Sequence, residues 1–111
     1  MNFPFVDYSQ SPGWIVQYNE QGYDVTTDAD GNIYFVDRDN HRLRKITTDG
    51  IINSIIGTGS TGSFGGGFNG DGQIGTDTML DKPSGVAIDG SGNVVFTDYD
   101  NQRIRMLASS P

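Results

Sequence analysis

The residues best suited to chemistry stand in a segment that occurs twice, as FVDRDNHRLRKI at 35–46 and FTDYDNQRIRML at 96–107. Each copy has an Asp at the end of an expected strand, an Asn in the next turn and an Arg after it. Such an Asp can accept N–H bonds from the turn, Asn tolerates the left-handed conformation, and Arg can pair with the Asp through a charge-assisted bond. We therefore predict no catalytic residues here. The residues of the predicted structural turn network are Asp37, Asn40, Arg42, Asp98, Asn101 and Arg103.

A calcium loop is the next candidate, because Asp28, Asp30 and Asn32 alternate in DADGN. Calcium needs six to eight oxygen ligands, with Gly at the sixth place of the loop and a distal Glu. Here Gly stands at the fourth place, no such Glu follows, and the second copy, DGSGN, lacks the middle Asp. The pattern favours a hairpin turn.

Two further motifs also have a simpler interpretation. Residues 57–62, GTGSTG, fit a dinucleotide-binding pattern, but the following SFGGGFNGDG cannot form the helix that such a site requires. His41 is the only histidine and is expected in a solvated turn, and the chain has no cysteine. One histidine alone does not make a metal site. We predict no cofactor and no metal.

The repeat defines the elements that must position these residues. When residues 22–46 are aligned with 83–107, ten of the 25 positions are identical, which indicates a repeat architecture. Short β-branched runs alternate with turns rich in Asp, Gly and Asn, a pattern typical of antiparallel strands. Strands are predicted at 24–28, 33–37, 42–46 and 51–57, and again at 85–89, 94–98 and 103–107.

A repeated four-stranded meander fits the blade of a β-propeller. The sequence GVAID-GSGN-VVFTD-YDNQRIRML resembles the NHL repeat, and the linker GFNGDGQIGTDTMLDKPSG resembles that of the subgroup that includes teneurin-type propellers. The resemblance covers residues 22–107 and implies an all-β fold of two four-stranded antiparallel blades, an incomplete propeller. Tyr23-Asp24 stands where the second copy has the more typical Ser84-Gly85, which suggests an altered start of the first blade.

Four segments follow from this alignment. They are an N-terminal β segment and candidate strand-exchange arm at 1–21, a first blade at 22–57, a Gly-rich inter-blade loop at 58–82, and a second blade at 83–111 that lacks its fourth strand. The loop is longer than most connections. It is expected to pack as an ordered excursion over one face, with partner binding as the alternative.

The incomplete second blade predicts self-association. Two blades cannot close a ring, because propellers need about four to eight. The run WIVQY at 14–18 could supply a fourth strand to another copy, or form a hairpin with residues 3–8. A dimer would make four blades and a trimer six; the alternative is a piece cut from a larger propeller. The expected contact residues are Trp14, Ile15, Val16, Tyr18, Ile104, Met106 and Leu107.

Composition narrows the function further. The net charge of −7 disfavours nucleic-acid binding, and no apolar run reaches the length of a membrane span or forms a signal peptide. The compartment stays open. We expect a non-enzymatic binding or scaffold module, with a peptide or glycan as a further partner. The resemblance also implies an alternative, part of a metal-dependent NHL-like lyase or lactonase propeller. A further alternative is an excised fragment without activity of its own.

Overall fold

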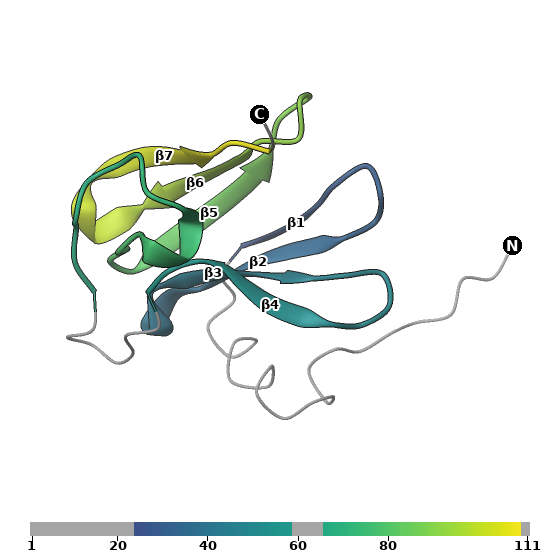
Figure 1. Ribbon diagram of the computed structural model, residues 1–111, viewed down its shortest axis with the longest axis horizontal. Coiled ribbons are helices and arrows are strands. Elements are labelled where there is room, and N and C mark those ends of the chain that lie inside the picture. The colour runs from purple at the N-terminus through teal and green to yellow at the C-terminus, as the bar shows by residue number, and fades with distance from the viewer. Residues whose placement is uncertain (1–23, 59–65, 110–111) are drawn as a thin grey trace, which may run out of the picture.

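The computed structural model describes residues 24–58 and 66–109, which form two antiparallel sheets (Figure 1). The first sheet contains β1 (Val25–Thr27), β2 (Ile33–Asp37), β3 (Arg42–Ile46) and β4 (Ile52–Ile56). The second contains β5 (Pro83–Ile88), β6 (Val94–Asp98) and β7 (Arg103–Leu107). Strand order in space follows the sequence in both, so each sheet is a meander like a propeller blade. The all-β prediction is confirmed.

The two sheets differ in strand number. Within the described residues the second sheet has three strands, so β7 is an edge strand without a neighbour on its outer side. The first sheet has β4 in the corresponding place, beside β3. The predicted strand at 14–18 and its hairpin alternative lie outside the described residues.

The first turn of each repeat is held by one carboxylate. Asp28 Oδ1 accepts the backbone N–H groups of Asp30 and Asn32 at 2.9 and 3.0 Å, and Oδ2 accepts the Asn32 side-chain amide at 3.0 Å. Asp89 makes the same bonds in the second repeat, with Ser91 and Asn93 as its partners. Because these carboxylates are occupied by N–H donors, the hairpin interpretation of DADGN is confirmed.

The second turn of each repeat is a short 3₁₀ helix, η3 (Arg38–Asn40) or η5 (Tyr99–Asn101). Each ends on a residue in the left-handed conformation, His41 or Gln102, with φ of 54° in both. We expected the Asn of the turn to adopt this conformation. That prediction is wrong by one residue, because Asn40 and Asn101 are the last residues of the 3₁₀ helices and the left-handed residue follows them as the cap. The side chains of the two Asn bond Asp37 and Asp98.

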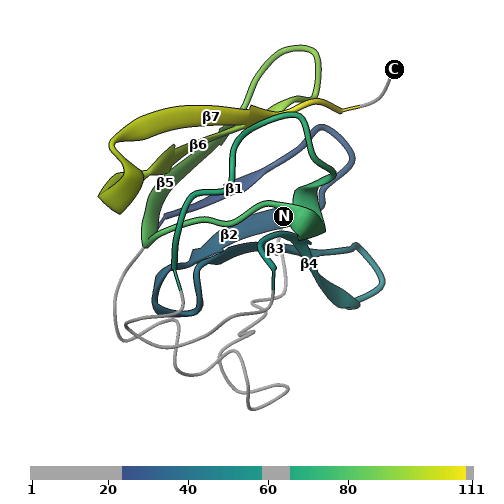
Figure 2. The same cartoon turned by 60° about the vertical axis from the view of Figure 1, so that its left-hand side comes forward.

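The core lies between the sheets, where β5 packs beside β1 and β2 (Figures 1 and 2). Alternate residues of the strands meet there, as the period of two requires. A register shift between Leu43 and Arg44 on β3 leaves Ile55 without a partner across the ladder. This bulge brings both Ile55 and Ile56 onto the core. The buried members of the main cluster are Tyr34, Val36, Leu43, Ile56, Leu80, Val86, Val94 and Phe96.

The described part of the long loop, 66–82, is folded against itself. Asn69 donates from its side chain to the carbonyl of Asp77 at 2.9 Å and accepts the N–H of Met79 at 2.8 Å. The 3₁₀ helix η4 (Gly75–Asp77) lies against β4, where Gly57 N–H donates to the Gly75 carbonyl at 3.0 Å. The expectation of an ordered excursion therefore holds for these residues; residues 59–65 lie outside the described part.

Among the residues that the structure describes, there is no helix with the length and apolar character needed to cross a membrane.

Candidate functional site

Asp98 is the centre of the best-developed polar network. Its side chain is fully buried. Its Oδ1 accepts the backbone N–H of Asp81 at 2.8 Å, while Oδ2 accepts Asn101 Nδ2 at 2.8 Å and Arg105 Nη1 at 2.9 Å. A buried carboxylate is tolerated only when it is paired and hydrogen-bonded. All of these donors are groups of the protein itself, so the network stabilises the fold.

Arg105 joins this carboxylate to the loop. Its guanidinium donates to the carbonyls of Met79 and Gly70 at 2.9 and 2.8 Å, and its Nη2 lies 2.8 Å from Asp71 Oδ1. The Phe68 ring lies 4.9 Å from the guanidinium carbon. The planar fork of Arg is suited to such simultaneous bonds. The second blade therefore holds residues 67–81 over its surface.

The structure corrects the arginine of the predicted turn network. Asp37 and Asp98 bond Asn40 and Asn101 as expected, but the paired arginines are Arg44 and Arg105. Arg44 Nε lies 3.0 Å from Asp37 Oδ2, as an ion pair whose angle does not meet the geometry of a hydrogen bond.

The reason for the correction lies in the sheet register. Arg42 and Arg103 stand directly opposite Asp37 and Asp98, yet their guanidinium groups turn back to the carbonyls of Asn40 and Asn101 at 3.3 and 3.1 Å. The long side chain at the diagonal position reaches the carboxylate instead. Arg44 and Arg105 are identical in the two repeats, but so are Arg42 and Arg103. The repeat alone therefore could not distinguish the two pairs of arginines.

His41 is buried, and the expectation of a solvated turn residue is wrong. Only 2% of its surface is exposed. Its Nδ1 accepts the backbone N–H of Lys82 at 3.1 Å and lies 3.7 Å from Asp81 Oδ1. The loop crosses the turn here and covers the imidazole, whereas the counterpart Gln102 is exposed.

Asp24 links the two sheets at their inner strands. Its carbonyl accepts the N–H of Val36 at 3.1 Å, and its Oδ2 accepts the N–H of Val86 on β5 at 3.1 Å. The second repeat has Gly85 at this place. The departure from the repeat pattern at residues 23–24 therefore marks an inter-sheet contact.

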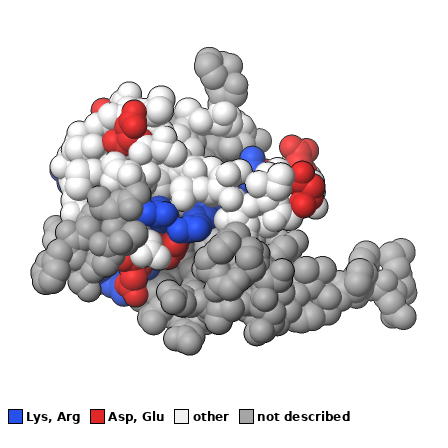
Figure 3. Space-filling model, turned by 60° about the horizontal axis from the view of Figure 1, so that its bottom comes forward, with Lys and Arg blue, Asp and Glu red and all other residues white. Residues whose placement is uncertain are grey.

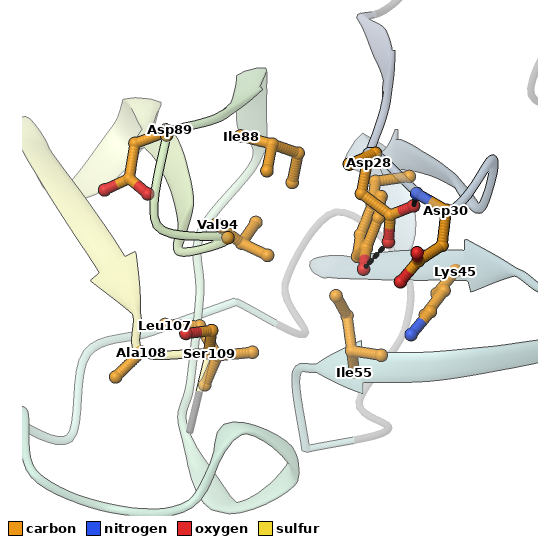
Figure 4. A pocket seen from close by; sticks show the side chains of 14 residues that line it. Asp28, Asp30, Lys45, Ile55, Ile88, Asp89, Val94, Leu107, Ala108 and Ser109 are labelled. Atoms are coloured by element: carbon orange, nitrogen blue, oxygen red, sulfur yellow. Dashed lines mark hydrogen bonds between the residues drawn. The ribbon is translucent and has the colours of Figure 1, made fainter. Parts of the chain in front are cut away.

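A cleft of about 400 Å³ opens between the sheets at their first turns (Figure 4). Ile55 faces Ile88, Val94 and Leu107 across it, and Asp28, Asp30 and Lys45 lie on the side of the first sheet. Tyr34 Oη donates to Asp28 Oδ2 at 2.8 Å. Burial, followed by this bond, raises the pKa of Tyr34 to about 12, while bonds led by the Asn32 side chain lower the pKa of Asp28 to about 2.

The chemistry available in this cleft is limited. The carboxylates of Asp28 and Asp89 already accept bonds from their own turns, and Lys45 Nζ lies 5.5 Å from the centre of the Tyr34 ring. Within 24–58 and 66–109, no three His, Asp or Glu side chains come together in a way that could hold a metal. Figure 3 shows a small group of basic side chains with acidic ones beside it.

The outer face of the second sheet is the other candidate site. Ile104 and Met106 are 77% and 59% exposed on β7. Leu107 was predicted to belong with them, but it is half-buried and packs against the core, because alternate residues of a strand point to opposite faces. The remaining predicted contact residues, Trp14, Ile15, Val16 and Tyr18, lie outside the described part of the chain.

No protein-family model matches the chain. Over 78 residues, 70% of this chain, it is 32% identical to the protein SUPPRESSOR OF QUENCHING 1, chloroplastic, of Arabidopsis thaliana, and covers 7% of that protein. It is 27% identical to an auxiliary nutrient binding protein from Bacteroides thetaiotaomicron, with a TM-score of 0.59 over 75% of this chain and 21% of that one. Virginiamycin B lyase from Staphylococcus aureus is 16% identical with a TM-score of 0.45, over 80% of this chain and 27% of that one.

The similarity to the Bacteroides structure agrees with the arrangement of the sheets. The chain is similar in structure to a part of β-propeller proteins, as two neighbouring blade-like sheets. It spans 7% of the Arabidopsis relative and about a fifth of the Bacteroides structure. The class that the fold and the comparisons define is therefore an all-β protein with two sheets like propeller blades.

Proposed function

We propose that the chain is a non-enzymatic binding and scaffold module of the NHL type that associates with further copies of itself. The observation that supports this most is the exposed outer face of β7. Ile104 is largely exposed, whereas its counterpart Leu43 in the first sheet is fully buried. Strand edges and large apolar surfaces are usually covered by a partner.

The proposed occupant of the β7 edge is the run Trp14–Tyr18 of a second copy. This run is apolar and rich in residues that favour strands. Addition of a strand to an open sheet edge is a common mode of association. A closed assembly of three chains would have six blades and one of two chains would have four. The assignment to the NHL type rests on the repeated residues of 22–46 and 83–107.

The mass in solution tests this proposal. One chain has a mass of 12.0 kDa, and light scattering is expected to give two or three times this value. The double variant Ile104→Lys, Met106→Lys should give a single-chain mass, because it places two charges on the outer face. Ile74→Lys is the matched control: Ile74 is 68% exposed, but on the loop. A single-chain mass for the unaltered protein would contradict the proposal.

A second candidate follows from the small share of its relatives that the chain spans. The two sheets would then be part of a longer propeller, and a third blade would cover β7 within one molecule. This candidate predicts a single-chain mass for residues 1–111 alone. The alternative of a metal-dependent lyase or lactonase is tested separately, by metal analysis of the purified protein.

A further inference from the structure

The two sheets can be compared residue by residue, because each residue of the second repeat stands 61 positions after its counterpart. Val36 and Leu43 are fully buried on the face that the first sheet turns to the second. Their counterparts, Thr97 and Ile104, lie on the outer face of the second sheet, where Thr97 is half-buried and Ile104 is exposed. Equivalent faces therefore differ in what covers them.

On the first sheet, part of the cover is the segment 80–83. Leu80 is 1% exposed and packs in the same cluster as Val36 and Leu43. Two residues later, the Lys82 N–H donates to His41 Nδ1, and Pro83 begins β5 as a fully buried residue. The segment in front of one repeat thus fits onto the second turn of the repeat before it.

Among the described residues, nothing covers the same place on the second sheet. A hollow of about 410 Å³, here named the outer hollow, is lined by Thr97, Tyr99, Asp100, Gln102, Arg103 and Ile104. Gln102 has the same left-handed backbone as His41, and its exposed side-chain amide makes no hydrogen bond to the described residues. Its Oε1 can accept a backbone N–H, as His41 Nδ1 does.

We infer that the outer hollow is a binding site for residues 19–22 of a second copy, the segment in front of the first repeat. This inference rests on the proposed self-association and names the contact that would accompany it. By the repeat offset, Asn19-Glu20-Gln21-Gly22 corresponds to Leu80-Asp81-Lys82-Pro83.

The polarity of the two sites supports this choice of segment. The first sheet places the apolar Val36 against Leu80. The outer hollow has Thr97 in place of Val36, and the segment has Asn19 in place of Leu80. A hydroxyl facing an amide can form a hydrogen bond, while a Leu in that place would leave the hydroxyl unsatisfied. Asp100 and Arg103 both line the hollow, so selection depends on these neutral groups and not on net charge.

Two short peptides test the inference by NMR on ¹⁵N-labelled protein. The variant Met106→Lys serves as the background for both peptides. Met106 lies outside the hollow, and we expect the charge of the introduced lysine to keep the chains apart. A peptide of residues 17–24 should shift the amides of Thr97, Gln102 and Ile104. It should bind about tenfold more tightly than a peptide of residues 78–85, a difference of about 1.4 kcal/mol.

A change of specificity provides the second arm of the test. The double variant Thr97→Val, Gln102→His gives the outer hollow the residues of the first sheet, which the same fold already carries at Val36 and His41. It should reverse the preference, so that the peptide of residues 78–85 binds more tightly. An Asn19→Leu change in the first peptide should weaken binding to the unaltered hollow and strengthen binding to the double variant.

Three results would overturn the inference: no shift with either peptide, shifts centred on His41 and Lys82, or tighter binding of the peptide of residues 78–85 to the unaltered hollow. These results are independent of the mass in solution. A single-chain mass together with binding of the peptide of residues 17–24 would refute self-association and leave the site in place. An oligomeric mass without peptide binding would do the reverse.

Discussion

At the scale of single residues, Arg105 and Arg103 form a natural pair for comparison. Both stand on β7, but Arg105 is buried against the fully buried Asp98, while Arg103 is exposed and donates to the Asn101 carbonyl. Removal of one partner from a buried ion pair leaves an uncompensated charge, whereas exposed contacts contribute little. The cost of substitution should therefore differ strongly between two arginines that are two positions apart.

We expect Arg105→Ala to lower the free energy of unfolding by about 3–5 kcal/mol, because Asp98 stays buried without its cation. Arg103→Ala, the matched control, should cost about 1 kcal/mol or less, because it loses only an exposed hydrogen bond and its stacking on Phe68. Urea denaturation of both variants measures the difference. Equal losses in the two variants would contradict the assigned roles.

The carboxylate of Asp28 predicts a loss of stability in acid. Its pKa of about 2 lies below the ordinary 3.8. A lowered pKa in the folded state stabilises the fold above the ordinary value, and this contribution disappears as the pH falls through about 2. The melting temperature should therefore fall between about pH 4 and pH 2.

Asn32→Ala should weaken this dependence, because the Asn32 amide is the main cause of the lowered pKa. NMR titration of the Asp28 carboxyl should then show a midpoint closer to 3.8. Asn93→Ala is the control, since it removes the same bond from Asp89 in the other repeat. A shift of the Asp28 midpoint in the Asn93 variant alone would refute this account.

At the scale of elements, the strands were predictable from local sequence and the contacts of the loop were not. The runs IYFVD and VVFTD carry β-branched and aromatic residues between turn residues, and they form β2 and β6 at the predicted bounds. The burial of His41 depends on Lys82, which is 41 residues away. The bulge at Ile55 falls in the run IINSII. The apolar residues of this run do not alternate regularly with polar ones, so the sequence does not indicate which of them face the core.

The predicted turn network shows the same limit on a smaller scale. The pairing of Asp37 with Asn40 followed from the turn chemistry of neighbouring residues. The choice of Arg44 over Arg42 depended on side-chain reach across two strands, which the spacing of residues does not show. Likewise, β7 was predicted as a strand, but the inward direction of Leu107 required the register with Val94.

The contact between η4 and β4 is the tightest point in the packing of the loop. A Cβ added at Gly75 would meet the Ile55 carbonyl oxygen at 2.1 Å. Gly75→Ala should therefore separate the loop from the first sheet and cost about 1–3 kcal/mol. Gly90→Ala is the control, because nothing lies within 4 Å of its added Cβ. Thermal unfolding of the two variants compares them, and an unchanged midpoint for Gly75→Ala would argue against the close contact.

At the scale of the whole molecule, the two sheets form a pair of neighbouring blades with unequal outer cover. The loop bonds to the second sheet through Arg105 and to the first through His41, and Asp24 joins the two sheets directly. The outer face of β7 presents Ile104 and Met106. The network of the second turns is thus a structural device, and the proposed binding surface lies on the opposite face of the second sheet.

The central claim is that β7 of one copy pairs with the N-terminal segment of another. Since the chain has no cysteine, the variant Val16→Cys can carry a spin label at that position alone. This variant is mixed with ¹⁵N-labelled protein that carries no spin label. The account predicts broadening of the amide signals of residues 103–107 in the ¹⁵N-labelled chains. The mixture is measured at a concentration where light scattering shows mostly oligomers and few single chains. Unbroadened β7 signals under this condition would contradict the account.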